Sequence, residues 1–188
     1  MTKLLMFDLR SSVPYPEATP EMTELLLTAR LNFGISEVSR WEPVHVAIIG
    51  NPESPPGLTD WMHAGTFRLV SKRFAEVLRS LNCECEFLPL IVHYHDKTLK
   101  DEYFALNALR VSDEAIDLEQ SKIGYYDTEF HSAEDIEKLV LKPDALGDAP
   151  LCYLGEMSHY AVSDELAKAI TAAGLIGIKL TDPAEFAS

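Results

Sequence analysis

The sequence predicts a single α+β domain over residues 1–188, with a mixed, mostly antiparallel sheet and about three helices. Three observations support this fold class. The chain has 188 residues, of which 47% are hydrophobic, which is enough for one sizeable core. Strand-like runs, six to eight in all, and helix-like periodicities follow one another in mixed order. No period of about 20–50 residues repeats, which argues against a solenoid or a propeller.

The first elements are a strand and a helix joined by a proline-rich connection. Residues 4–9 form a short apolar run that predicts the first strand. Three prolines within residues 14–20 stiffen the chain that follows. Thr19 before Pro20 is typical of a helix start, and Gly34 is typical of a helix end. The apolar face of this helix would consist of Met22, Leu25, Leu26, Ala29 and Phe33.

The next segments are a strand and a loop. Residues 44–49 are a continuous apolar run, which predicts a strand buried on both faces. Residues 50–57 contain three prolines and two glycines, and this composition indicates a surface loop. We interpret this loop as the end of a variable amino-terminal part, residues 1–57, within the single domain.

The middle of the chain has the clearest local patterns. Residues 67–70 predict a strand, and Ser71 can cap a helix that runs on to Leu81. Strands are also predicted over residues 85–95 and 103–111. The apolar residues of the helix recur at the spacing of one helical face, at Phe74, Val77, Leu78 and Leu81.

The last part of the chain predicts two short strands, a helix and a final strand. The short strands are expected near residues 136–141 and 151–154. Ser163, followed by two acidic residues, indicates the start of a helix that ends at Gly174. The final strand is expected over residues 177–180.

The charge of the chain excludes two kinds of partner. Sixteen basic and 30 acidic residues give a net charge of −14, and the isoelectric point is near 4.7. A nucleic-acid-binding protein needs basic residues that displace counterions from phosphates, and an anionic membrane attracts the same residues. We therefore expect no nucleic-acid partner and no membrane partner, whereas a basic protein partner remains open.

The amino terminus and the cysteines favour a cytoplasmic protein. Asp8 and Arg10 interrupt the first apolar run, so no secretory signal is expected. No stretch approaches the roughly 20 apolar residues that span a bilayer. The three cysteines are an odd number, and Cys83 and Cys85 are too close in sequence for an unstrained disulfide. We expect reduced thiols, with Cys152 in the core.

Several metal-binding residue types lie close together, but their spacing argues against a joint site. Cys83, Cys85, His93 and His95 would share one face of a strand. The eight residues from Cys85 to His93 span roughly 26 Å at about 3.3 Å per residue. One zinc ion cannot bridge that distance unless the strand breaks sharply, for example at Pro89. A half-site of two histidines would need further ligands, so we expect no metal and no cofactor.

Motifs for nucleophilic catalysis and phosphate binding are missing from the sequence. It contains no G-x-S-x-G, H-E-x-x-H or G-x-x-x-x-G-K-[ST] pattern. Gly174 and Gly177 resemble part of a glycine-rich turn, but they follow a helix and precede a strand, the reverse of a dinucleotide-binding turn. A small hydrolase that uses Cys152 or the histidines stays as an alternative without local support.

Residues 101–137 hold most of the net charge. Eleven acidic and two basic residues give this segment a charge of −9, and aromatic residues are interleaved with the acids. Acids can steer a basic protein partner while aromatics anchor it. The alternative is a solvated face with its aromatics buried beneath it. The candidate partner-binding patch consists of Asp101, Glu102, Tyr103, Asp113, Glu114, Asp117, Tyr125, Tyr126, Asp127 and Glu129.

Several stretches within residues 67–181 are common local patterns when each is taken alone. Their order and spacing along the chain are distinctive. The stretches are VSKRFAEVL at 70–78, EFLPL at 86–90, YFALN at 103–107, IDLEQS at 116–121, and VSDEL at 162–166 with Gly174 and Gly177. This region resembles a bacterial immunity-protein family, the eleventh immunity class of polymorphic toxin systems, formerly a domain of unknown function.

The resemblance implies a non-catalytic protein that neutralises a cognate toxin in the cytoplasm by occupying or distorting its active site. The toxin would typically be encoded by the adjacent gene. Structural roles as caps, core residues and turn residues explain most of the resembling positions, among them Ser71, Phe87, Asn107 and Gly177. The resemblance therefore identifies a scaffold and no contact residues. The partner could equally be an exported protease, for example a subtilisin-like one, held inactive until secretion. A passive subunit of a larger assembly is a third interpretation.

Overall fold

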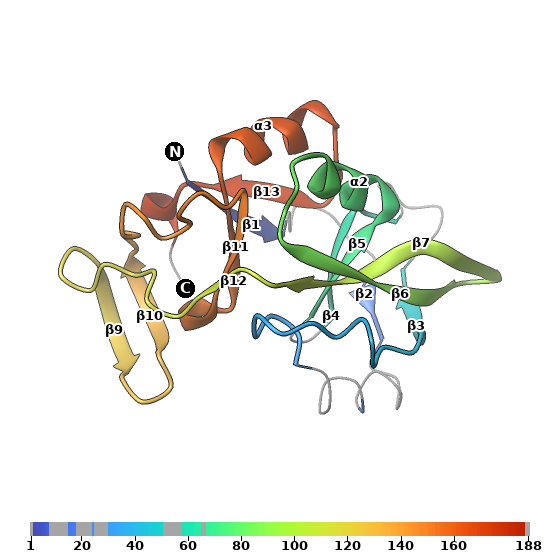
Figure 1. Cartoon of the computed structure of the whole chain (residues 1–188), viewed down its shortest axis with the longest axis horizontal. Coiled ribbons are helices and arrows are strands. Elements are labelled where there is room, and N and C mark those ends of the chain that lie inside the picture. Colours follow the sequence, from blue (N-terminus) through green and yellow to red (C-terminus); the bar gives the residue numbers. More distant parts are fainter. Residues whose placement is uncertain are drawn as a thin grey trace.

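The computed structural model describes residues 2–7, 15–17, 24, 30–50, 58–64 and 67–186. In this part of the chain, a five-stranded and a six-stranded sheet share one molecule with a separate two-stranded hairpin, which projects at one end (Figure 1). Two α-helices lie next to each other on one side of the sheets (Figure 1). This arrangement confirms the α+β class with mostly antiparallel strands in a single domain.

The five-stranded sheet joins the two ends of the chain. Its order is β13-β1-β12-β11-β8, so the first strand lies between two of the last ones. The β8–β11 pair is parallel and the other pairs are antiparallel. The strands are β1 (Lys3–Phe7), β8 (Val111–Ser112), β11 (Leu151–Leu154), β12 (His159–Val162) and β13 (Ile178–Thr181).

The six-stranded sheet has the order β2-β3-β6-β7-β5-β4. The β3–β6 pair is parallel and the others are antiparallel. Its two long central strands form a hairpin that extends to the end of the molecule opposite the two-stranded sheet (Figure 1). The strands are β2 (Tyr15–Pro16), β3 (Val44–Ile49), β4 (Trp61–Ala64), β5 (Phe67–Ser71), β6 (Cys85–Tyr94) and β7 (Lys97–Ala108).

Both described α-helices begin as their sequences predict. α2 (Lys72–Ser80) follows Ser71, and α3 (Asp164–Ala172) follows Ser163. Each serine hydroxyl accepts a hydrogen bond of 3.2 Å from the backbone N–H three residues further on. Gly174, at a φ of 59°, lies just beyond the end of α3.

The core has three clusters of buried side chains. The first joins both sheets to the helices, where Trp61 meets Phe74 and Tyr160 edge-on, at ring-centroid distances of 5.8 and 5.5 Å. The second cluster contains only side chains of the six-stranded sheet and its connections. The third cluster, which includes Leu4 and Ile136, joins the five-stranded sheet to the two-stranded hairpin.

Two 3-10 helices, η1 (Gly155–Met157) and η2 (Pro183–Glu185), complete the described elements. Within the residues that the structure describes, no helix combines the length and the apolar character needed to cross a membrane.

The strand predicted at residues 44–49 is confirmed as β3, but its burial on both faces is wrong. Val46 and Ile48 are buried, whereas His45 and Ile49 are exposed. The reason is that the second core cluster covers one face of this part of the sheet and the other face remains open to water. A continuous apolar run can therefore mark a strand with one covered face.

The helix predicted over residues 19–34 falls mostly outside the described residues, as do residues 8–9 of the first strand and residues 51–57 of the proline-rich loop. Residues 31–34 form a turn instead of the last turn of that helix. Asn32 and Gly34 have positive φ values of 64° and 69°, which a right-handed helix does not allow. Phe33, which was expected on the buried face, is exposed.

Other differences concern boundaries and short strands. The strand expected at residues 103–111 begins earlier, at Lys97, and ends at Ala108. The strand expected at residues 136–141 is shifted to Ser132–Lys138. No pattern predicted β4, β9 (Lys122–Asp127) or β12, which have four to six residues and show little alternation. Such short strands are defined by their neighbours in the sheet.

Candidate functional site

The hairpin of β9 (Lys122–Asp127) and β10 (Ser132–Lys138) forms the two-stranded sheet at one end of the molecule (Figure 1). Its two strands pair antiparallel with each other. Tyr125 and Phe130 are 53% and 74% exposed. Ile136 is buried in the third core cluster and fixes the hairpin to the five-stranded sheet. The hairpin therefore presents aromatic side chains to solvent on a base that is anchored in the core.

The carboxylate of Asp127 orders the turn of this hairpin. One of its oxygens accepts hydrogen bonds from the backbone N–H groups of Phe130 (2.9 Å) and Glu129 (2.8 Å). These two bonds, the one from Phe130 first, hold the pKa of Asp127 below its ordinary value. Phe130 is therefore held by a turn whose hydrogen bonds come from residues two and three positions away.

A buried carboxylate joins the hairpin to the segment before it. One oxygen of Glu156 accepts hydrogen bonds from the backbone N–H groups of Ala115 (2.6 Å) and Ile116 (2.9 Å), and the other accepts one from the hydroxyl of Tyr126 (3.0 Å). Burial first, and then the bond to Glu156, raises the pKa of Tyr126 to about 12. Three donors thus stabilise a carboxylate that has almost no contact with water.

A cavity of about 460 Å³ opens beside the contact between Tyr126 and Glu156. Its charged lining is mostly acidic: Glu114, Asp117 and Glu119 join Glu156, and Lys142 is the basic residue opposed to them. Carboxylates gathered around one hollow create a negative potential there. This end of the molecule therefore favours contact with a positively charged surface.

The structure brings seven of the ten residues of the predicted patch to this end of the molecule. Some lie on the hairpin and the others on the adjoining segment 113–117, which is close enough for two of its carboxylates to affect the hydroxyl of Tyr126. The seven residues, which we call the acidic face, are Asp113, Glu114, Asp117, Tyr125, Tyr126, Asp127 and Glu129.

The other three residues of the predicted patch lie elsewhere. Asp101 and Glu102 are exposed in the first half of β7, towards the β6–β7 turn at the opposite end of the molecule (Figure 1). Tyr103 is buried in the second core cluster, and its hydroxyl donates a hydrogen bond of 3.0 Å to the carbonyl of Thr59. Burial raises the pKa of Tyr103. Tyr103 therefore belongs to the core, and its side chain exposes almost no surface.

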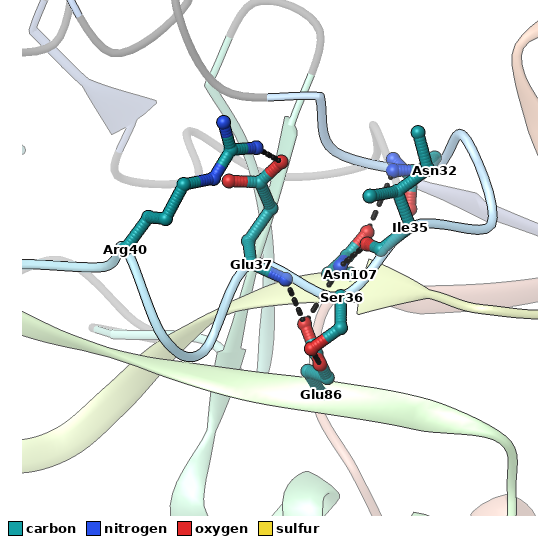
Figure 2. Close-up of polar contacts among 7 residues, drawn as sticks. All are labelled: Asn32, Ile35, Ser36, Glu37, Arg40, Glu86 and Asn107. Carbon is teal, nitrogen blue, oxygen red and sulfur yellow. Dashed lines mark hydrogen bonds and ion pairs between the residues drawn. The ribbon is translucent and has the colours of Figure 1, made fainter.

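A second polar arrangement, which no pattern in the sequence indicated, fastens residues 31–40 to β6 and β7 (Figure 2). We call this segment the latched loop. Asn107 of β7 is fully buried, and its side-chain oxygen accepts a hydrogen bond from the backbone N–H of Asn32 (2.7 Å). Its side-chain nitrogen donates to the carbonyl of Ile35 and to the carboxylate of Glu86, both at 2.9 Å. One buried amide group thus holds the loop at two points.

Glu86 of β6 holds the loop at two further points (Figure 2). Its carboxylate accepts hydrogen bonds from the hydroxyl of Ser36 and from the backbone N–H of Glu37 (2.9 Å). Burial by itself would raise the pKa of Glu86, but the bonds from Ser36, Glu37 and Asn107 outweigh it and lower the pKa. Glu37 is itself buried, and its carboxylate pairs with Arg40 at 2.6 Å.

Asn32 locks the beginning of the latched loop to both sheets. Its side-chain oxygen accepts hydrogen bonds from the backbone N–H of Ala108 (2.9 Å) and from the hydroxyl of Tyr160 (2.7 Å). Gly34 packs so close to the chain that an added Cβ would lie 3.3 Å from the carbonyl oxygen of Leu109. The partners of the loop are 49 to 128 positions away in sequence. For that reason the local sequence, in which Gly34 is typical of a helix end, gave no indication of a latch.

Three large apolar side chains of the latched loop are exposed to water. Phe33 is 71%, Ile35 40% and Val38 62% exposed. The loop therefore combines a backbone that is held by many hydrogen bonds with an apolar outer surface. A surface of this kind is typical of protein–protein contact, because neighbouring exposed apolar side chains mark such sites.

The cysteines lack the properties of catalytic nucleophiles. Burial raises the pKa of the Cys152 thiol to about 11, and it raises those of Cys83 and Cys85 to about 11 and about 12. The thiolate is the reactive form, so all three are almost wholly protonated at neutral pH. Cys152 lies in the third core cluster, as its apolar sequence context predicted.

The histidines pair differently from the arrangement that the sequence suggested. His93 contacts His45 of β3, with 2.7 Å between Nε2 and Nδ1 and with the rings stacked. His95 lies in the turn after β6, where its Nε2 is 2.5 Å from the carbonyl oxygen of Gly50. β6 passes Pro89 with a shift of register and without a sharp break. The described residues form no group of three or more side chains that could hold a metal ion.

Comparison with known proteins found one family. The model of a family described as "Immunity protein family (Imm11)" matches residues 14–185. The match extends well beyond the stretches of residues 67–181 on which the resemblance rested, and it includes the latched loop. No curated protein matches the sequence.

Proposed function

The chain belongs to the immunity protein family Imm11, and from this premise we propose that it is a cytoplasmic inhibitor that binds and neutralises a cognate toxin. The observation that carries the proposal is the family match over residues 14–185. Neutralisation requires a stable complex, and an interface of roughly 1,600 Å² in total is ordinary for such a complex. The inhibitor acts by covering or distorting the active site of the toxin and needs no catalysis of its own.

The acidic face supports this proposal and indicates the charge of the partner. Its carboxylates lie on the hairpin and the segment against it, together with the exposed rings of Tyr125 and the neighbouring Phe130, next to a cavity with a mostly acidic lining. Charge of one sign speeds the encounter with a protein of the opposite sign, and aromatic side chains can then be buried. The toxin is therefore expected to present a basic docking surface.

The chemistry of the described residues favours binding over hydrolysis. The thiol of Cys152 is buried and has a raised pKa, which is the opposite of what a nucleophile needs. A Cys152→Ala variant separates the two functions: an inhibitor keeps its effect on the toxin, whereas a cysteine hydrolase loses its activity.

Co-expression with the product of the adjacent gene tests the proposal. The two proteins are expected to co-purify as a stoichiometric complex, and the activity of the adjacent product is expected to fall as purified inhibitor is added. If the adjacent product neither binds nor loses activity, the inhibitor proposal is wrong. The activity that is lost also identifies the class of partner, because an antibacterial toxin and an exported protease kept inactive before secretion act on different substrates.

A further inference from the structure

The exposed apolar residues of the chain are not spread evenly. Eight large hydrophobic side chains are exposed among the described residues. Three of them, Phe33, Ile35 and Val38, lie in one stretch of six residues inside the latched loop. Folding normally drives such side chains inward, because removing apolar surface from water stabilises the folded chain. The loop keeps them in water, so its conformation has to be maintained by other interactions.

The interactions that maintain the loop are unusually demanding. They place the polar side chains of Asn32, Glu37 and Asn107 in the protein interior, where every donor and acceptor needs a partner. They also hold Asn32 at a φ of 64°, in the left-handed region. None of these bonds brings Phe33 or Val38 into the core. The arrangement fixes the backbone beneath exposed apolar side chains, which is the state that a preorganised binding loop requires.

The latched loop is continuous with the acidic face. A Cβ added to Gly34 would lie 3.3 Å from the carbonyl oxygen of Leu109 and 3.9 Å from Val111. Val111 belongs to β8, and the chain enters the acidic face at Asp113, immediately after that strand. A protein docked on the acidic face can therefore reach the loop along β8.

We propose that the latched loop is the apolar anchor of the interface, with Phe33 and Val38 inserted into an apolar depression on the basic toxin. This inference rests on the proposed function and names the part of the surface that provides most of the affinity. The acidic face then governs the rate of association, and the anchor governs how long the complex lasts.

Charge decides between the toxin and a second copy of the chain as the occupant of this surface. Each copy carries −14, and the acidic face adjoins the loop, so two copies would bring like charges together. A basic protein gains attraction at the same place. The loop is therefore suited to a partner of opposite charge, and the free protein is expected to be a monomer.

The test measures binding of purified inhibitor variants to the purified product of the adjacent gene. Phe33→Ala is expected to weaken the affinity on the order of 30-fold, mainly through faster dissociation, and Val38→Ala about 5-fold. Ile176→Ala is the control, because Ile176 is also a large exposed apolar side chain, at 40%, and lies outside the loop. The control is expected to bind within about 2-fold of the wild type. Thermal unfolding verifies that each variant is folded.

The outcomes separate this inference from the proposed function. If the wild type binds and both loop variants bind equally well, the anchor is wrong and the inhibitor function stands. If the wild type does not bind the adjacent product, both proposals are wrong. If the free wild type is a dimer in solution and Phe33→Ala makes it a monomer, the loop is a self-association surface and the inference is overturned.

Discussion

The β9–β10 hairpin and the latched loop each expose a phenylalanine to almost the same extent, 74% for Phe130 and 71% for Phe33, but they hold it in different ways. The turn that holds Phe130 is ordered by Asp127, three positions away. The loop that holds Phe33 is ordered by Asn107 and Glu86, which come from two other strands. A local turn can reopen without disturbing the core, whereas the latch opens only if buried hydrogen bonds are broken.

The two regions also differ in the interaction that they offer. The hairpin and its neighbouring segment present carboxylates around a cavity, and the loop presents apolar side chains. Long-range attraction between charges acts before contact, and burial of apolar surface acts only after it. Steering and anchoring are therefore assigned to separate parts of one surface.

The largest expected effect is the loss of the latch. Asn107→Ala removes a fully buried amide that joins Asn32, Ile35 and Glu86. The polar groups of these three residues then lose their hydrogen bonds to Asn107. We expect the free energy of unfolding to fall by about 3 kcal/mol, measured by urea denaturation. Asp127→Ala, the matching change in the hairpin turn, is expected to have a clearly smaller effect. Equal losses for the two variants would show that the hairpin turn is as firmly held as the loop.

Binding provides the second prediction, because the latch should position Phe33. Phe33→Ala is expected to weaken toxin binding on the order of 30-fold, and Phe130→Ala by less than about 5-fold. In the Asn107→Ala background, the effect of Phe33→Ala is expected to shrink, because the side chain is no longer held in place. A double-mutant cycle at a temperature where every variant is folded measures this coupling. Additive effects of Asn107→Ala and Phe33→Ala would rule out a positioning role for Asn107.

The third prediction concerns the acidic face. Neutralising Glu114 and Glu129 of the acidic face, together with Glu119 of the adjoining cavity, to glutamine is expected to slow association with the toxin on the order of 10-fold at low salt and to leave dissociation nearly unchanged. At 1 M salt, where the Debye length is about 3 Å, the variant and the wild type should associate at similar rates. Stopped-flow measurements over a salt series provide the comparison. Asp101→Asn with Glu102→Gln is the control, because these acids lie near the β6–β7 turn; an equal slowing by the control would remove the acidic face from the mechanism.

The smallest effect is a dependence of stability on pH. The pKa of Glu86 is lowered in the folded protein, so its contribution to stability is present above the unfolded pKa of about 4.3 and is lost as the pH falls through the folded value. Because the carboxylate is partly solvated, the contribution is expected not to exceed about 1 kcal/mol. When the pH is lowered from about 6 to about 3, the free energy of unfolding of the wild type should fall more than that of Glu86→Gln. Parallel stability curves for the two proteins would contradict a charged role for Glu86 in the latch.

Local sequence was sufficient for the parts of the fold that depend on neighbouring residues. Ser71 and Ser163 cap their helices through the N–H three positions on, so the cap can be recognised from the sequence. The strand at residues 85–94 was recognisable from its composition. The burial of Tyr103 could not be predicted from the local sequence, because Tyr103 follows two acidic residues. In the folded chain its side chain lies on the face of β7 that packs into the second core cluster. Acidic composition therefore grouped ten residues into one predicted patch, and the fold places seven of them at one end of the molecule.

The amino-acid sequence alone specifies the net charge of −14, the α+β class, the helix caps and the resemblance to an immunity family, because each depends on composition or on residues that are close in the chain. Which acids share a face depends on the folded chain, which separates Asp101 and Glu102 from the others. Folding also creates the latch, because Asn32 and Tyr160 are 128 positions apart and meet only when both sheets have formed. Hydrogen bonds between distant residues leave no periodic pattern, and the surface that they support becomes visible only in the folded chain.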